Sequence, residues 1–411
     1  SASRPILAKK MLELLQKDVI PVIPELGSVG ASGDLTPLSY LAAVIMGKRS
    51  VYYKGKIVDT AVAFKAEHIE PLLIEAKEGL AIMNGTSVMT AVACLCWKKA
   101  ERLANISDFL TAVTSEISRG KDTPFVKKVS EIKNHRGQMA SAAYVYNIIK
   151  DSKRVWRYED FLKNEIENLG EKKFIAQQNK IQDRYSIRCA PQITGVYRDT
   201  LDFSRNLITE ELNSANDNPL VDIDEGRLYN TGNFYGGHIC AACDYMRTAL
   251  ANIADLSDKQ AEVIIDGKFN GLTENLIPFT APNHERAGLR LGFKAAQITI
   301  SALRGEAATF CFPVSLTSAP TEALNQDKVS MGTISARKWA EQIDIVFLQF
   351  ATHLLAAMQA VDLAGLDDFA PFTKKVHSEV RKLSAFVEDD RELDKEAEAV
   401  CEWLKATPLF N

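Results

Sequence analysis

Residues 86–119 read TSVMTAVACLCWKKAERLANISDFLTAVTSEISR and contain neither glycine nor proline. In the second half of this stretch, apolar residues recur at spacings of three and four: Leu103, Ile106, Leu110, Val113 and Ile117. This spacing places them on one face of a helix. The first half, 88–97, is apolar on almost every side, so we expect it to be buried. The stretch therefore predicts a long helix inside a helical bundle.

Other parts of the chain repeat this pattern. Further stretches without glycine or proline are 196–218, 238–266, 333–364 and 372–407. Strand signals are confined to two short hairpins, 51–58 turning at Lys54-Gly55 and 220–229 turning at Glu225-Gly226. We therefore predict an all-α protein, a long central helical bundle with one or two small β-hairpins. Residues 1–366 form the bundle body and 367–411 a C-terminal helical layer. Two long connections, 265–282 and 312–331, are expected to be functional loops.

Composition excludes several classes of function. The chain has 411 residues, and its 49 basic and 53 acidic side chains give a net charge of −4. Without a basic excess, a nucleic-acid or membrane-surface binder is not expected. Seven cysteines at irregular spacing are no disulfide framework and are typical of a reducing compartment, so we predict a cytoplasmic protein. No metal-ligand spacing occurs, apart from an isolated Cys240-x-x-Cys243.

Residues 345–361 carry no formal charge and could be mistaken for a membrane span. Polar residues interrupt this run, and it is shorter than a typical transmembrane helix. They are Gln349, Thr352, His353 and Gln359. We expect a helix at the centre of a bundle or at a subunit interface.

The chemistry is expected in residues 27–38, GSVGASGDLTPL. Its glycines permit a crowded backbone, and residues 34–37 are typical of a helix start. A phosphate-binding loop has similar ingredients, but no Gly-Lys-Ser/Thr follows and no β-α-β pattern surrounds it. In Ala31-Ser32-Gly33 the Gly33 nitrogen could instead attack the Ala31 carbonyl. Loss of two waters would close a five-membered ring and leave an electrophilic methylidene at Ser32.

Residues 27–38 resemble the signature of the histidine and phenylalanine ammonia-lyase family, whose Ala-Ser-Gly forms 4-methylidene-imidazol-5-one (MIO). Further segments agree, in the family's order: NGT at 84–86, QDRYSIRCAPQ at 182–192, NSANDNPL at 213–220, GNFYG at 232–236 and NQDKVSMG at 325–332. The resemblance covers essentially the whole chain. The Gly-Ser-Ser-x-Met-Pro signature of the related fumarase and aspartase group is absent.

The resemblance implies a carbon-nitrogen lyase that removes ammonia from an aromatic L-amino acid and leaves the α,β-unsaturated acid. Its cofactor would be MIO, formed autocatalytically from Ala31, Ser32 and Gly33, with no metal and no dissociable cofactor. The substrate amine would add to the methylidene before a base takes the β-proton. Apart from its small-molecule substrate, the implied partner is its own chain, in a homotetramer with shared active sites. Neither nucleic acid nor membrane is expected.

The resemblance also implies roles for individual residues. Arg188 would hold the substrate carboxylate, because a guanidinium offers a planar fork. Tyr185 lies three residues earlier, so on a helical turn it faces the same way and would contact the ring or the substrate. The other residues implied to bind substrate are Asn84, Gln182, Phe234, Asn325 and Gln326. Structural alternatives remain, namely a salt bridge at Arg188, a helix N-terminal cap at Asn84 and plain packing at Phe234.

The preferred substrate and the exact reaction stay open. Histidine ammonia-lyases usually have Glu where Gln326 stands and His where Lys328 stands, so this chain resembles the phenylalanine and tyrosine members more than the histidine members. A 2,3-aminomutase uses the same prosthetic group and is not separated from a lyase by these residues. The family's tyrosine base lies on a loop before the signature. Because this sequence begins 31 residues before Ser32, we expect that base upstream of Ser1. A third hypothesis is a catalytically silent helical assembly with Ser32 unmodified.

Overall fold

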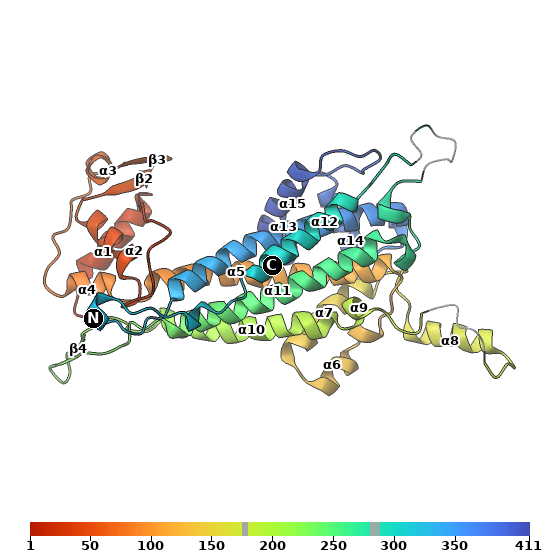
Figure 1. Ribbon diagram of the computed structural model, residues 1–411, viewed down its shortest axis with the longest axis horizontal. Helices are drawn as coiled ribbons and strands as arrows, with labels where there is room; N and C mark the ends of the chain where they lie inside the picture. Colours follow the sequence, from red (N-terminus) through yellow and green to blue (C-terminus); the bar gives the residue numbers. More distant parts are fainter. Residues whose placement is uncertain (175–179, 280–284, 286–287) are drawn as a thin grey trace. The chain divides into compact units, whose positions relative to one another are not determined.

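A computed structural model describes residues 1–174, 180–279, 285 and 288–411 and consists mainly of helices (Figure 1). The chain divides into two compact units. The first unit is Ser1–Cys96, Ser204–Tyr245 and Phe312–Ala340, and the second is Trp97–Phe203, Met246–Cys311 and Glu341–Asn411. Four of the five boundaries fall inside long helices, and the fifth lies between Cys311 and Phe312, outside the helices. A separate C-terminal layer beginning at residue 367 stays a prediction.

Four of the predicted long helices are confirmed. They are α5 (Ser87–Ile117), α10 (Ala190–Leu212), α11 (Gly237–Ile265) and α13 (Gly332–Ala364). Helix α10 begins earlier than predicted because Pro191 lies in the first turn, where its missing N–H has no intrahelical partner to lose. Gly195 lies inside α10 where this helix comes very close to α7 (Arg136–Ile149). A Cβ on Gly195 would lie 2.6 Å from the backbone nitrogen of Gln138 on α7, so the close approach requires a glycine.

The prediction of one helix over 372–407 is wrong. The structure has α14 (Pro371–Val380) and α15 (Asp394–Ala406) with an irregular segment between them. Acidic side chains in this segment bind another part of the chain. Asp390 accepts hydrogen bonds from the backbone nitrogens of Leu291 at 2.7 Å and Gly292 at 3.0 Å. The run lacks glycine and proline, but these carboxylates stabilise a loop in place of a continuous helix.

Both predicted hairpins are confirmed. Strands β2 (Ser50–Tyr53) and β3 (Lys56–Asp59) pair antiparallel, as do β4 (Leu220–Asp222) and β5 (Arg227–Tyr229). A short strand, β1 (Ile20–Pro21), pairs with β2 and was not predicted, because two residues show no alternation.

The first unit has its own apolar core beside this sheet. Its helices are α1 (Pro5–Gln16), α2 (Leu35–Ile45), α3 (Thr60–Glu67) and α4 (Glu78–Met83). They and the sheet enclose one cluster of buried residues that includes Leu14, Ile45, Val51 and Phe64. Burial of such side chains is the main stabilising contribution, about 1.5–3 kcal/mol for each.

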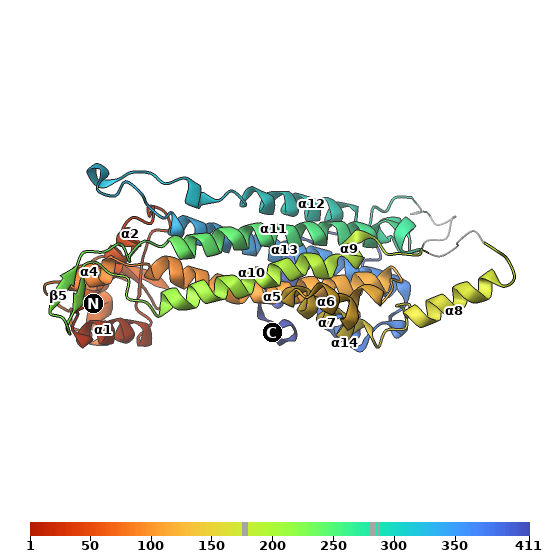
Figure 2. The same cartoon turned by 90° about the horizontal axis from the view of Figure 1, so that it is seen from below.

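In the second unit, long helical segments run side by side (Figures 1 and 2). The Tyr197 hydroxyl on α10 donates to the carbonyl of Ala100 on α5 at 2.9 Å. The remaining helices of this unit are α6 (Lys127–Lys133), α8 (Tyr158–Leu169), α9 (Tyr185–Arg188) and α12 (Lys294–Thr309). Of the described residues, only α13 forms a helix long and apolar enough to cross a membrane, and 83% of its apolar window is buried. That burial agrees with the predicted core helix.

Polar side chains on α13 form hydrogen bonds with neighbouring segments of the second unit. Gln349 donates to the carbonyl of Ala254 on α11 at 2.7 Å. The ring of His353 lies 2.9 Å from the Ser257 hydroxyl, and burial lowers the pKa of His353 to about 3, so the imidazole is neutral. Gln359 donates to the carbonyl of Val387 at 2.9 Å. Because a buried polar group without a partner is costly, these bonds favour one register of α13.

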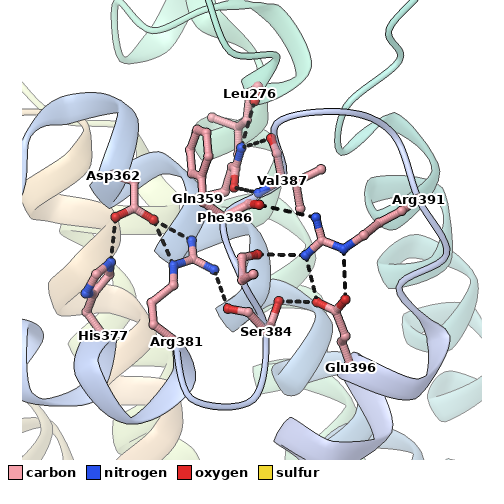
Figure 3. A network of polar contacts seen from close by, with 11 residues as sticks. Leu276, Gln359, Asp362, His377, Arg381, Ser384, Phe386, Val387, Arg391 and Glu396 are labelled. Atoms are coloured by element: carbon pink, nitrogen blue, oxygen red, sulfur yellow. Dashed lines mark hydrogen bonds and ion pairs between the residues drawn. The ribbon is translucent and has the colours of Figure 1, made fainter.

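At the end of α13, Asp362 joins this helix to α14 (Figure 3). His377 lies 2.7 Å from one carboxylate oxygen, and Arg381 donates to the other at 2.8 and 2.6 Å. Burial by itself would raise the pKa of Asp362. The hydrogen bond from His377 and the charge of Arg381 outweigh burial, and the pKa is lowered. The contacts of Asp362 with His377 and Arg381 therefore stabilise the fold only while the Asp362 carboxylate is ionised.

We predict that Asp362→Asn lowers the free energy of unfolding at pH 7 by about 2 kcal/mol, since charge-assisted hydrogen bonds are lost. The folded-state pKa lies below the ordinary value of 3.8. The contribution is therefore complete above the unfolded-state pKa and is lost as pH falls through the folded-state pKa. The free energy of unfolding, measured by urea denaturation at neutral pH and below pH ~4, should fall more with acid in the wild type than in Asp362→Asn. Asp367→Asn, at an exposed carboxylate nearby, is the control. If the free energy of unfolding falls equally with acid in the wild type and in Asp362→Asn, the stabilising role of the Asp362 carboxylate is contradicted.

Candidate active site

The Ala31-Ser32-Gly33 segment bends sharply in the loop before α2. Ser32 has a φ of 48° and Gly33 a φ of 76°. A left-handed φ is uncommon for a residue with a Cβ and is found where surrounding structure imposes it. A five-membered ring through the N–Cα bond of Ser32 requires a small torsion about that bond. The observed bend brings this torsion nearer to the closed ring than an extended chain would.

A second glycine segment clamps this loop. The backbone nitrogen of Asp34 donates to the carbonyl of Gly85 at 2.7 Å, and Gly33 pairs with Gly85 in an isolated β-bridge. A Cβ on Gly33 would lie 2.1 Å from the Gly85 oxygen. A Cβ on Gly85 would in turn lie 2.6 Å from the side-chain oxygen of Asn216. The motif at 84–86 therefore contacts the signature loop, and the motif at 213–220 contacts the motif at 84–86.

Asp34 anchors the loop to two helix starts. Its buried carboxylate accepts hydrogen bonds from the backbone nitrogens of Val88 and Met89, each at 2.9 Å, and from the Thr333 hydroxyl at 2.5 Å. Burial raises the pKa of Asp34, and these hydrogen bonds offset part of the rise. The sequence indicated a helix start at Asp34, and α2 does follow it. The side chain, however, caps α5 and binds the first turn of α13.

A third helix start lies in the same place. A Cβ on Gly236, just before α11, would lie 2.2 Å from the Met89 sulfur, and a Cβ on Gly332, which begins α13, would lie 2.4 Å from it. The starts of α5, α11 and α13 therefore pack together in the first unit. The N-terminal end of a helix carries partial positive charge, which stabilises nearby anionic groups.

The segment 325–332 also lies against the signature loop. The side-chain amide of Gln326 donates to the Ser32 hydroxyl oxygen at 3.2 Å. Further along, the Met331 nitrogen donates to the Val29 carbonyl at 3.0 Å, and the Ser330 hydroxyl donates to the Gly30 carbonyl at 3.2 Å. Asn325 is exposed and donates to Glu322 at 3.0 Å, so its side chain is engaged away from Ser32.

Asn84 and Phe234 lie in the same unit. Asn84 follows the last residue of α4, so it is no helix N-terminal cap. Its side-chain nitrogen donates to the Asn218 carbonyl at 2.8 Å. Its side-chain oxygen is buried and has no hydrogen-bond partner among the described residues. Phe234 is half-buried in the turn before α11.

The other predicted residues belong to the second unit. Arg188 and Tyr185 form one helical turn, with the guanidinium carbon 4.5 Å from the ring centroid. The Arg188 Nε is buried and has no hydrogen-bond partner in the described part of the chain. Both residues and Gln182 line a cavity of about 540 Å³. The structure thus groups Gln182, Tyr185 and Arg188 around one hollow in the second unit.

Sequence reasoning missed two residues of the Ser32 surroundings. Thr321 donates its hydroxyl hydrogen to the side-chain oxygen of Gln326 at 2.7 Å. Thr333 bridges Asp34 and Ser28, whose hydroxyl lies 3.0 Å away. Neither threonine shows a sequence signal of its own, because the contact of Thr333 joins distant segments and that of Thr321 depends on the shape of a tight turn. In the described part of the chain, no cluster of three or more metal-binding side chains occurs.

Comparisons with known proteins agree with the fold and these motifs. A family model described as aromatic amino acid lyase matches residues 1–382, and the chain belongs to that family. The protein is therefore a carbon-nitrogen lyase, and the predicted resemblance and all-α fold are confirmed. One relative is the histidine ammonia-lyase of Geobacillus sp. (strain WCH70). It is 36% identical over 412 residues, covering 100% of this chain and 76% of the relative.

Solved structures of two aminomutases are also similar. The tyrosine aminomutase from Streptomyces globisporus has a TM-score of 0.92 and 34% identity, covering 98% of this chain and 76% of its own. The phenylalanine aminomutase of Pantoea agglomerans has a TM-score of 0.91 and 32% identity, covering 99% and 77%.

We predict that Asp34→Ala lowers the free energy of unfolding by about 3 kcal/mol, because buried N–H and O–H donors lose their acceptor. Asp59→Ala is a matched control, since Asp59 caps α3 at an exposed site by accepting from the Ala61 nitrogen. Asp59→Ala should lower the free energy of unfolding by about 1 kcal/mol, as is typical when an N-cap residue is replaced by alanine. Urea denaturation followed by circular dichroism measures both. Equal losses for the two variants would contradict the anchoring role of Asp34.

Proposed function

We propose that this protein removes ammonia from an aromatic L-amino acid, with phenylalanine or tyrosine favoured over histidine, and leaves the α,β-unsaturated acid. The proposal depends most on one observation: the left-handed turn at Ser32, held between Gly85 and the Gln326 amide. Such a turn is suited to closure of Ala31-Ser32-Gly33 into MIO. Phe or Tyr as substrate, the cofactor, a homotetramer and a cytoplasmic location are all part of this proposal.

The residues present fit this prosthetic group. Gly33 lies so close to Gly85 that a side chain would block the position. The Gln326 amide supplies a donor at Ser32, and packed helix starts supply partial positive charge in the same unit. Ala31, Ser32 and Gly33 would form the group, which when present supplies the electrophilic carbon that captures an amine.

The chain's own residues would bind and orient the substrate. Arg188 would hold the substrate carboxylate. Its buried Nε has no hydrogen-bond partner among the described residues and could donate to that carboxylate, which supports this role. Tyr185 and Gln182 share its cavity and would contact the bound substrate. The unpaired oxygen of Asn84 would accept a hydrogen bond from the substrate amine. Phe234 and Asn325 are proposed as further contacts, with Asn325 turning from Glu322 when substrate binds.

The neutral amide at Gln326 supports an aromatic hydrocarbon or phenol ring over an imidazole. An aromatic 2,3-aminomutase is the second candidate, because the tyrosine and phenylalanine aminomutases resemble this chain over most of its length. The two reactions differ only in whether ammonia leaves or adds again at the β-carbon. Similarity to histidine ammonia-lyases makes histidine a necessary third test substrate.

We predict that the wild-type chain is lighter than its sequence mass by two water molecules and that Ser32→Ala has its full sequence mass. Phenylalanine, tyrosine and histidine should each be tested by near-ultraviolet absorbance, with chromatography for β-amino acids. Ser32→Ala should lose all turnover but keep its helical circular dichroism, because only the hydroxymethyl source of the electrophile is removed. A wild-type chain of unshifted mass and no turnover would support the silent assembly. Turnover by Ser32→Ala would refute the proposed chemistry.

We predict that Arg188→Lys raises KM about tenfold to a hundredfold, because an ammonium cannot reproduce the two-pronged contact with a carboxylate. Arg49→Lys is the control, since the Arg49 guanidinium carbon lies 3.9 Å from the Tyr40 ring centroid and Arg49 lines none of the described cavities. Steady-state kinetics with the preferred substrate would separate KM from kcat. Equal KM values in the wild type and Arg188→Lys would argue against Arg188 as the carboxylate ligand.

A further inference from the structure

The Gln326 side chain occupies a defined position between two hydroxyl groups. Its nitrogen donates to the Ser32 oxygen at 3.2 Å, and its oxygen accepts from the Thr321 hydroxyl at 2.7 Å. An amide has distinct donor and acceptor ends, and here the acceptor end faces Thr321 while the donor end faces Ser32. The Ser32 oxygen thus faces a hydrogen-bond donor, not an acceptor.

That oxygen has a particular place in the maturation of the loop. In the first dehydration, the Gly33 nitrogen bonds to the Ala31 carbonyl carbon. The carbonyl oxygen then leaves as water with the amide hydrogens of Ser32 and Gly33, and a C=N bond forms. In the second dehydration, Ser32 loses its Cα hydrogen and its hydroxyl group as water, and a Cα–Cβ double bond forms. No electrons are gained or lost overall. Only the second step breaks the bond to the Ser32 hydroxyl oxygen.

We propose that Gln326, oriented by Thr321, promotes the second dehydration by hydrogen bonding to the departing Ser32 oxygen. This inference rests on the proposed function, since it requires that the loop matures. Negative charge builds on the oxygen as its bond to Cβ breaks, and an N–H donor already in place stabilises that charge. Thr321 strengthens the donor, because a hydrogen bond accepted at the amide oxygen polarises the amide. Thr321 is therefore a positioning residue for Gln326.

The backbone supports this placement. Thr321 and Gln326 face each other as an isolated antiparallel bridge, with the Thr321 nitrogen donating to the Gln326 carbonyl at 3.0 Å. The turn between them has three consecutive non-glycine residues in the left-handed region: Glu322, Ala323 and Leu324 with φ of 49°, 51° and 71°. Left-handed non-glycine residues are individually unfavourable and concentrate at functional sites. Four residues after Gln326, the Ser330 hydroxyl donates to the Gly30 carbonyl and holds this segment against the signature loop.

The test follows the mass of the Ser32 peptide over time. The full chain is made by cell-free translation, aliquots are denatured at intervals, and the peptide is measured by mass spectrometry. Gln326→Met removes both the donor and the acceptor of the side-chain amide at similar size, and Thr321→Val removes the hydroxyl at the same shape. Each should slow the loss of the second water by about tenfold to a hundredfold, as expected for a lost charge-assisted hydrogen bond. A species lacking only one water should accumulate.

Matched variants distinguish positioning from damage to the loop. Thr321→Ser keeps the hydroxyl and should mature at the wild-type rate. Thr317→Val removes a hydroxyl from the same loop whose hydrogen-bond partner among the described residues is the Val314 carbonyl, and this variant should also mature normally. Thermal unfolding followed by circular dichroism verifies that all variants fold. In Gln326→Glu, only the protonated acid can donate, so maturation should accelerate as pH falls toward ~4.3. The wild-type rate should not follow that profile.

The outcomes separate the two proposals. A wild-type chain that never loses water overturns the proposed function, and the role of Gln326 with it. If the wild type matures and both Gln326→Met and Thr321→Val mature at the same rate, only the role of Gln326 and Thr321 is overturned. Slow maturation without the species lacking one water would also overturn it, because the defect would then precede the second dehydration.

Discussion

The buried carboxylate of Asp34 is the interaction on which the candidate site depends. It follows Ala31-Ser32-Gly33 directly and binds the backbone at the start of α5 and the Thr333 hydroxyl at the start of α13. A carboxylate without partners would be strongly disfavoured at such a site. With these donors in place, the residue fixes a short irregular loop to two long helices. The bend at Ser32 then has rigid neighbours on its C-terminal side.

Packing around Asp34 leaves little room for other arrangements. Gly33 comes so close to the Gly85 carbonyl that it could not carry a side chain without displacement of the backbone. Gly236 and Gly332 similarly meet the Met89 sulfur. Close packing of this kind transmits strain instead of absorbing it. It explains how a serine can be held with a left-handed φ, a conformation that a free loop would rarely adopt.

The second unit shows the same use of buried polar groups for a different purpose. Gln349, His353 and Gln359 give α13 its polar interruptions, and each meets a partner on a neighbouring segment. Such bonds contribute modestly to stability but strongly disfavour a slipped helix, which would leave buried donors unpaired. Asp362 extends the pattern to α14 through His377 and Arg381 (Figure 3).

The sequence alone determined the all-α class, four long helices, both hairpins and the family. Helix periodicity, turn residues and ordered motifs are local properties that do not require knowledge of the fold. The absence of glycine and proline was misleading at 381–393, where Asp390 binds the backbone of a loop at Leu291 and Gly292. Only the tertiary structure decided that Asp34 caps α5, that Gln326 faces Ser32 and that Thr321 orients it. Those contacts join residues from different segments or across a tight turn, and their geometry comes from packing that spacing along the chain does not encode.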